Sequence, residues 1–201
     1  MSNKIVVVAL GCILTFGIYG SLIGQNLILD KRKMSVQGTS TLHDWESSIN
    51  EITVSGEVIL DRESLEAVNN IQVSIPARSI KSTKGNLMDK KTHQALKASK
   101  HPSITFKMKD ADIDEKTSTV TMNGTLTIAG KSKDVPLKLT YKVLSDQQVS
   151  FQTSHEINLK DFNIEPPTAM MGTIKTGKKV NLSFALVVNV AKNAVDISKS
   201  R

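Results

Sequence analysis

The chain has 201 residues, of which 26 are lysine or arginine and 19 are aspartate or glutamate, so its formal net charge is +7. An all-β sandwich or barrel of this length is normally a single domain with one core. The basic residues are dispersed and only 4% of the residues are aromatic, which argues against a nucleic-acid-binding protein. The charge instead fits solvated lysines on outward strand faces, or a weak and transient attraction to an anionic membrane surface.

Residues 1–24 have the pattern of a signal peptide. Lys4 precedes a nearly continuous apolar run over residues 5–23, and small residues follow it. The run predicts export to the periplasm or the extracellular space, while its length of about 20 residues leaves an uncleaved membrane anchor as the alternative. The single cysteine, Cys12, lies in this segment, so the exported chain is expected to fold without disulfides.

Apolar and polar residues alternate through most of the remaining chain, and each alternating stretch predicts a half-buried strand. In chain order the apolar rows are Met34 and Val36; Ile52, Val54, Val58 and Leu60; Ile71, Val73 and Ile75; Ile104, Phe106 and Met108; Val120, Met122, Leu126 and Ile128; Val135, Leu137, Leu139 and Tyr141; Val149, Phe151, Ile157 and Leu159; and Val180, Leu182, Phe184, Leu186 and Val188. About eight strands with one apolar face each predict an all-β, antiparallel fold. Gly56 and Gly124 lie in apolar rows, which favours a strongly coiled barrel over a two-sheet sandwich.

One short helix is predicted between the third and fourth of these stretches. Asn86 can cap it, and Asp89 three residues later suits its positive end. A narrow apolar stripe at helical spacing contains Met88, Thr92, Ala95 and Leu96. Pro102 marks a point by which the helix must have ended. A helix in this position of a β-rich chain is expected to cover an opening or an edge of the sheet.

No motif in the sequence predicts catalysis. The four histidines are His43, His93, His101 and His155, and they lack the His-Glu-x-x-His spacing or another metal-ligand spacing. There is no Gly-x-Ser-x-Gly elbow and no phosphate-cradling glycine loop. We therefore predict a protein that is not an enzyme and that needs no cofactor or metal.

Four motifs in a fixed order resemble the YceI-like family. They are Val73-Ser74-Ile75-Pro76 with Ser79-Ile80; Leu96 with His101-Pro102-Ser103-Ile104-Thr105-Phe106; Gly124-Thr125-Leu126-Thr127-Ile128-Ala129-Gly130-Lys131 with Val135-Pro136-Leu137; and Asp161-Phe162-Asn163-Ile164. The resemblance implies an exported, lipocalin-like antiparallel β-barrel over residues 27–190 with the helix beside it. It also implies a deep apolar cavity that binds a long-chain isoprenoid, a quinone or another lipid-like molecule without catalysis. Residues 191–201 form a polar tail that is expected to be loosely ordered.

Alternation alone leaves two interpretations of the barrel interior. On alternation alone a filled β core is the favoured interpretation, and only the resemblance reverses that order. With a cavity, the protein is expected to carry or sequester an apolar ligand; with a filled core, it is a structural or protein-interaction barrel at the cell envelope. An enzyme that acts on an isoprenoid in the same cavity is a third hypothesis. The sequence leaves a homodimer open.

The residues expected to line the cavity come from the apolar rows, the helix and two loops. They are Met34, Leu42, Trp45, Val54, Val73, Ile75, Ile80, Leu96, Ile104, Phe106, Met122, Leu126, Leu139, Phe151, His155, Phe162, Met170, Met171 and Leu186. Trp45 is expected either at the cavity mouth or as a packed residue on the barrel rim. Met170 and Met171, in the predicted loop 161–179, could form an adaptable portal or a hydrophobic plug. His155 could donate a hydrogen bond to the polar end of a ligand.

Overall fold

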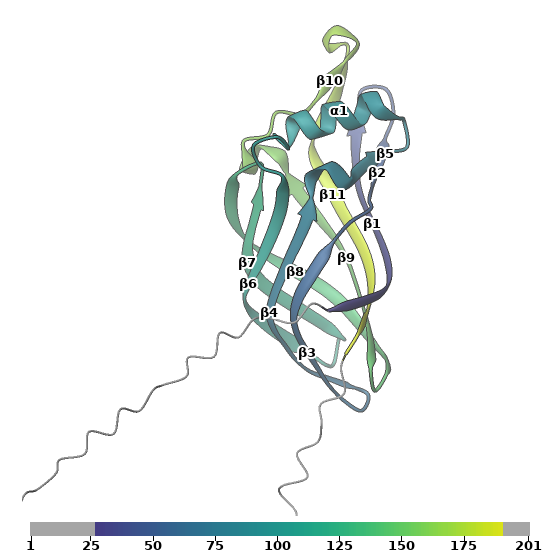
Figure 1. The fold of residues 1–201 in the computed structure, drawn as a ribbon, viewed down its shortest axis with the longest axis vertical. Coiled ribbons are helices and arrows are strands. Elements are labelled where there is room, and N and C mark those ends of the chain that lie inside the picture. Colours follow the sequence, from purple (N-terminus) through teal and green to yellow (C-terminus); the bar gives the residue numbers. More distant parts are fainter. Residues whose placement is uncertain (1–26, 191–201) are drawn as a thin grey trace, which may run out of the picture.

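The alternating stretches form strands of one antiparallel sheet in the computed structural model, which describes residues 27–190 (Figure 1). The strands are β1 (Ile28–Ser40), β2 (Trp45–Ile49), β3 (Thr53–Asp61), β4 (Ser64–Pro76), β5 (Ile80–Ser82), β6 (Ser103–Asp114), β7 (Thr119–Ile128), β8 (Lys131–Ser145), β9 (Gln148–Asn158), β10 (Thr168–Ala169) and β11 (Ile174–Asn189). The helices are α1 (Asn86–Ala95) and the short 3-10 helices η1 (Ala77–Ser79), η2 (Leu159–Phe162) and η3 (Met170–Gly172). The predicted all-β, antiparallel class with a helix beside the sheet is confirmed.

The sheet has eleven strands where about eight were expected, because two long strands are interrupted and β10 adds a short pair. Residues 50–52 separate β2 from β3, and η1 separates β4 from β5 just after Pro76, which has no N–H to continue the ladder. The interrupted strands nevertheless stay paired, β2 with β5 and β3 with β4. Between the two pairings, the Asn50 N–H donates to the Ser79 carbonyl at 3.2 Å. Each pair of segments therefore behaves as one bent strand.

The order of the strands brings the two ends of the sheet together. That order is β3-β4-β6-β7-β8-β9-β11-β1-β2-β5. The first member, β3, continues the bent strand that begins with β2, and the last member, β5, continues the bent strand that begins with β4. These two bent strands pair with each other, so the ends of the sheet meet. In addition, the Leu27 N–H donates to the Val54 carbonyl at 2.9 Å, which joins the start of β1 to β3. The sheet thus curls around an interior.

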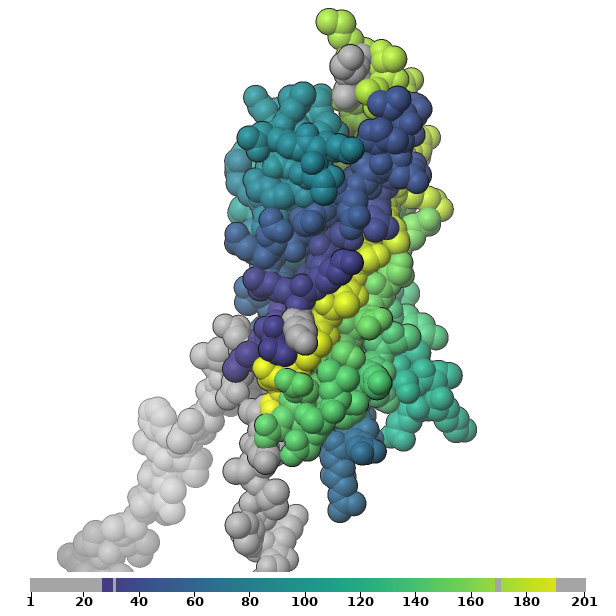
Figure 2. Space-filling view, turned by 90° about the vertical axis from the view of Figure 1, so that its right-hand side faces the viewer, coloured from purple at the N-terminus to yellow at the C-terminus, as the bar shows by residue number. Residues whose placement is uncertain are grey.

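The two ends of this curled sheet are built differently (Figure 1). The β3–β4, β6–β7 and β8–β9 turns lie at one end, which we call the closed end. Beside these turns, Leu65 is 1% exposed and Val120 and Val149 are 0% exposed, so packed side chains fill the interior there. At the opposite end, which we call the helix end, lie the β1–β2 turn, α1 and the segment from η2 to η3. The space-filling view shows the loop with β10 and η3 projecting beyond the rest of the helix end (Figure 2).

Polar contacts fasten α1 to the strand before it. Gly85, with φ of 91°, is the N-cap, so the expected cap Asn86 is the first helical residue instead. A glycine adopts this backbone conformation without the steric cost of a Cβ atom. Asp89 is buried and accepts a hydrogen bond from the Ser82 N–H at 2.7 Å, while Lys81 Nζ lies 3.4 Å from its other oxygen. Asp89 therefore ties the first turn of α1 back to β5.

The attachment of α1 is expected to weaken in acid. The hydrogen bond from the Ser82 N–H, helped by Lys81, holds the pKa of Asp89 below its ordinary value of 3.8. Because the folded-state pKa is the lower one, the stabilisation is complete above the unfolded-state value and is lost as the pH falls below it. We expect Asp89→Asn to cost about 1 kcal/mol at neutral pH and almost nothing well below pH 4. Urea denaturation at both pH values measures this, and an equal cost at both would contradict it.

Candidate functional site

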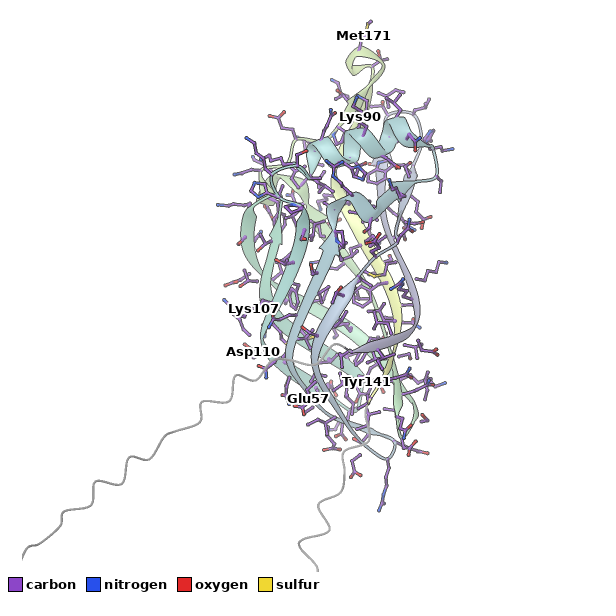
Figure 3. The ribbon with its side chains drawn as sticks, in the orientation of Figure 1. Glu57, Lys90, Lys107, Asp110, Tyr141 and Met171 are labelled. Carbon is purple, nitrogen blue, oxygen red and sulfur yellow. The ribbon has the colours of Figure 1, made fainter. Side chains whose placement is uncertain are left out.

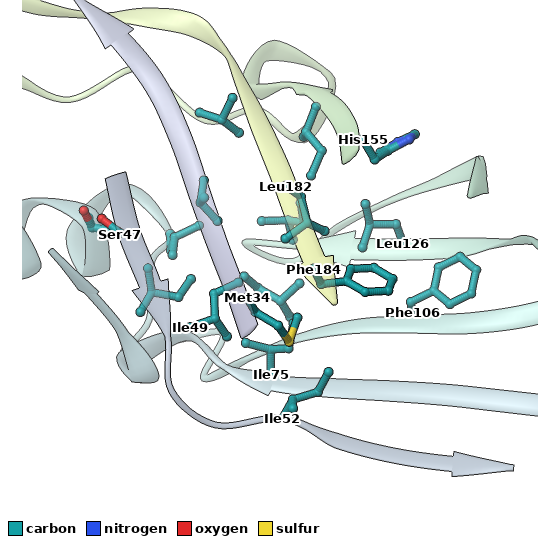
Figure 4. A pocket seen from close by; sticks show the side chains of 18 of the residues that line it. Met34, Ser47, Ile49, Ile52, Ile75, Phe106, Leu126, His155, Leu182 and Phe184 are labelled. Atoms are coloured by element: carbon teal, nitrogen blue, oxygen red, sulfur yellow. The ribbon is translucent and has the colours of Figure 1, made fainter. Parts of the chain in front are cut away.

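A cavity of about 410 Å³ lies inside the curled sheet, between the packed closed end and α1. Its wall consists almost entirely of aliphatic and aromatic side chains from the inward faces of the strands, among them Met34, Ile75, Phe106, Leu182 and Phe184 (Figure 4). Small-molecule sites in proteins typically measure roughly 300–1,000 Å³ and are mostly apolar. The interior is therefore large enough for a slender apolar ligand.

Most side chains that were expected to line a cavity lie in this wall. They are Met34, Leu42, Trp45, Val54, Val73, Ile75, Ile80, Leu96, Ile104, Phe106, Met122, Leu126, Leu139, Phe151, His155 and Leu186. The strand residues among them meet because residues at every second position of a strand face the same side, and the sheet curls around that side. Leu42 comes from the β1–β2 turn and Leu96 from the C-terminal end of α1.

The remaining three expected residues come from the segment between β9 and β11. Phe162, the last residue of η2, is 2% exposed and packs in the core without lining the cavity. Asn163, with a left-handed backbone, ends η2 directly after it. Met171 is fully exposed at the tip of the loop that contains η3, so it neither lines nor plugs the cavity (Figure 3). The side chain of Met170 lies outside the described residues. The loop itself is shorter than expected because β11 already begins at Ile174.

The wall also contains side chains that the sequence reasoning left out. Val36, Leu182 and Phe184 occupy the same apolar rows as residues that were chosen, so parity alone could have identified them. Ser47, which is 2% exposed, lines the cavity from β2, where no alternating stretch was recognised. Lys91 lies three residues after Met88 on α1 and could have been found by extending the helical stripe.

The cavity meets the solvent at the helix end. Exposed residues of its wall include Leu42 and His43 from the β1–β2 turn, Lys84 before α1, and Thr168 of β10. The predicted stripe of α1, which is Met88, Thr92, Ala95 and Leu96, faces the cavity from above this opening. Lys91 Nζ donates to the Thr168 carbonyl at 2.7 Å and so links α1 to β10 across it. Helix α1 therefore covers part of the mouth.

Trp45 lies on the rim and lines the cavity at the same time. Its indole N–H donates to the Thr39 carbonyl at 3.0 Å, and its ring lies directly over Gly38. A side chain at position 38 would collide with this ring, so glycine is required there by the close approach. Trp45 is the only tryptophan of the chain, which makes its fluorescence a specific reporter of the mouth.

His155 supplies a polar group on an otherwise apolar part of the wall (Figure 4). The side chain is half-buried, and this burial lowers the pKa of the imidazole below its ordinary value of 6.5. The ring is therefore neutral at physiological pH, with one nitrogen able to donate and the other able to accept a hydrogen bond.

Residues 27–190 contain neither a metal-binding cluster nor a membrane-spanning helix. Within them, no group of three or more His, Cys, Asp or Glu side chains is arranged to hold a metal ion. None of the helices in the same part of the chain is long and apolar enough to cross a membrane. The predicted signal segment 1–24 and the tail 191–201 lie outside the described residues.

Known proteins resemble this chain in both sequence and fold. A sequence model of the YceI-like domain matches residues 28–188. Among solved structures, BcnA of Burkholderia cenocepacia shares 19% identity with a TM-score of 0.59, covering 78% of this chain and 95% of that one. A polyisoprenoid-binding domain of Saccharophagus degradans, implicated in plant cell wall breakdown, shares 13% with a TM-score of 0.61, covering 83% and 98%. The YceI protein of Campylobacter jejuni shares 23% with a TM-score of 0.57, covering 73% and 85%. The search of curated proteins found no match.

Proposed function

Because the chain belongs to the YceI-like domain family, we propose that it carries or sequesters one long-chain isoprenoid, or a similar lipid-like molecule, in the cavity of its sheet. The observation that carries this proposal is the apolar cavity of about 410 Å³, which is packed shut at the closed end and open at the helix end. The Saccharophagus degradans domain of similar fold is described as polyisoprenoid-binding, which supports this class of ligand.

The dimensions of the cavity favour a chain-like ligand. Its wall extends from Val58 and Val68, near the β3–β4 turn, to Leu42 at the mouth. Burying hydrocarbon contributes about 0.8 kcal/mol per CH₂, so a five-carbon isoprene unit contributes roughly 3–4 kcal/mol. Immobilising a ligand costs about 4–15 kcal/mol, so several units must be buried before binding becomes tight. A long apolar interior meets this requirement, whereas a compact ring would leave much of it unused.

The distribution of polar groups sets the direction of the ligand. The deep part of the wall is apolar, while Ser40, Ser82, Lys84 and Lys91 line the cavity near its mouth. A lipid-like molecule therefore enters with its hydrocarbon tail first and keeps its polar end at the mouth, because burying a polar group without a partner is costly. His155 offers a neutral hydrogen-bonding group to a ligand with a second polar atom along its length, such as a quinone.

We also propose that the protein acts outside the cytoplasm, in the periplasm or the extracellular space. The support is the apolar run over residues 5–23 after Lys4. A carrier with no catalytic step suits the chemistry of the wall, which offers aliphatic and aromatic side chains to the bound chain.

Organic extracts of the natively purified protein, analysed by mass spectrometry, test the proposal. We expect a polyprenyl or acyl species in about equimolar amount, and added polyprenol is expected to change the fluorescence of Trp45 until the same ratio is reached. No extracted lipid together with no response to polyprenol would overturn the proposal and favour a structural barrel. Conversion of the bound species by the purified protein would instead reveal an enzyme.

A further inference from the structure

We infer that the helix end docks onto the surface of an anionic phospholipid bilayer, so that the cavity mouth faces the membrane. The proposed function gives this docking its purpose, because a lipid-like ligand can then pass between bilayer and cavity without crossing water. The residues that carry the inference are different from those that form the deep wall.

Three exposed apolar side chains lie at the helix end, each on a separate segment. Leu42 in the β1–β2 turn is 66% exposed, Leu87 in the first turn of α1 is 69% exposed, and Met171 in η3 is fully exposed. Met171 is at the tip of the projecting loop (Figure 3). Single exposed apolar residues need no explanation, but a group of them at the end where an apolar cavity opens is typical of interaction and membrane sites.

A basic groove lies at the helix end, between α1 with the residues that follow it and the η1–β5 segment. Its side chains are Arg78, Lys81, Asn86, Asp89, Lys90, His93, Gln94, Lys97, Ala98, Ser99 and Lys100. Asp89 is the only carboxylate among them, and it already accepts the Ser82 N–H and pairs with Lys81. The groove therefore keeps a clear excess of positive charge. Such clusters are attracted to anionic lipid headgroups.

The orientation of α1 determines the kind of contact. The helix keeps its apolar stripe on the cavity, so it does not lie in the bilayer as an amphipathic helix does. Contact with the bilayer is made instead by Leu42, Leu87 and Met171, which can reach into the headgroup layer, and by the lysines of the helix end. Binding of this kind is reversible and weakens as salt screens the charges. An acidic protein would complement the lysines but would give no role to apolar side chains at the same end as a lipid-sized opening.

Vesicle flotation tests the docking with a chain that begins at Leu27. The described sheet and α1 lie within residues 27–190, and leaving out the apolar run 5–23 prevents that run from binding vesicles. We expect binding to phosphatidylcholine vesicles that contain phosphatidylglycerol, little binding to phosphatidylcholine alone, and release by high salt. Brominated acyl chains in the vesicles are expected to quench Trp45.

Matched variants separate the helix end from the rest of the surface. Lys90→Gln with Lys97→Gln is expected to weaken vesicle binding about 25-fold, since each lysine near an anionic surface is worth about fivefold. Leu87→Ser with Met171→Ser is expected to weaken it at least tenfold while leaving polyprenol binding unchanged, because neither residue lines the cavity. The control for the lysine variant is Lys116→Gln with Lys142→Gln, since both lysines are exposed and lie away from the mouth, in the β6–β7 turn and on β8. The control for the apolar variant is Leu144→Ser, because Leu144 is 47% exposed and lies just before the β8–β9 turn. They should bind normally.

The outcomes keep docking and ligand binding apart. Absence of phosphatidylglycerol-dependent binding, or equal losses in helix-end and control variants, would overturn the docking. Vesicle binding without any bound lipid would leave the docking intact and defeat the proposed function. If the protein binds a lipid-like ligand but never associates with vesicles, the proposed function stands and the docking is overturned.

Discussion

Two indole rings placed inside the cavity are expected to weaken ligand binding a few hundredfold while the fold persists. Val73 on β4 and Leu182 on β11 both line the cavity and are only half-buried, so Val73→Trp and Leu182→Trp direct their rings into open space. Displacing one five-carbon unit of a ligand removes roughly 3–4 kcal/mol, which is a few hundredfold in affinity. Titration of the double variant with polyprenol, followed by calorimetry, measures the loss.

The matched control places the same two rings on the outside of the sheet. Gln72 precedes Val73 on β4, and Gln152 follows Phe151 on β9; both glutamines are exposed. Gln72→Trp with Gln152→Trp is expected to bind polyprenol like the wild type. Overpacking a filled core typically costs about 1–3 kcal/mol per site, so a nearly unchanged melting temperature for the inward variant also shows that its rings enter empty space. Full affinity in the inward variant would place the ligand elsewhere.

Truncating two leucines is expected to have very different effects on stability. Leu65 is 1% exposed and packs in the filled closed end, so Leu65→Ala should lower the free energy of unfolding by about 2–5 kcal/mol. Leu182 already faces the cavity and lacks neighbours on one side, so Leu182→Ala removes fewer contacts and should cost about 1 kcal/mol. Because whole domains are stable by only about 5–15 kcal/mol, the first change takes a large part of the total.

Urea denaturation of the ligand-free proteins measures both values. The slope of the free energy against urea concentration should stay constant, so that the midpoints report stability alone. Similar costs for Leu65→Ala and Leu182→Ala would mean that Leu182 is packed as tightly as a core residue. The cavity would then be closed in solution, and the proposed function would lose its site.

The fold class and the apolar rows could be predicted from the sequence because both are local. Alternation over a few residues determines which side of a strand is apolar, and it places Val73 and Ile75 on the same side as Phe106. The interruptions of the long strands could not be predicted, for a different reason. The breaks at residues 50–52 and after Pro76 depend on how the bent strands pair with each other, which no local pattern reports.

The size of the interior and the parts of the mouth were the least predictable features. Whether facing apolar rows touch or leave a space depends on the curvature of the whole sheet, and alternation alone favoured a filled core. Met171 illustrates the difficulty in loops: its type suggested an apolar environment, but a turn carries it into solvent. The sequence suggested that Asp89 stabilises the positive N-terminus of the helix, whereas its principal partner is the Ser82 N–H of the preceding strand.

The packed closed end limits the length of hydrocarbon that the cavity can hold. A tail that enters from the mouth would stop where Leu65, Val120 and Val149 fill the interior, so we expect the far end of every ligand to rest at the same depth. Units beyond that depth remain outside in water and contribute little. Affinity is therefore expected to rise with each added isoprene unit up to a fixed number and then to level off, with the plateau set by the protein and not by the ligand.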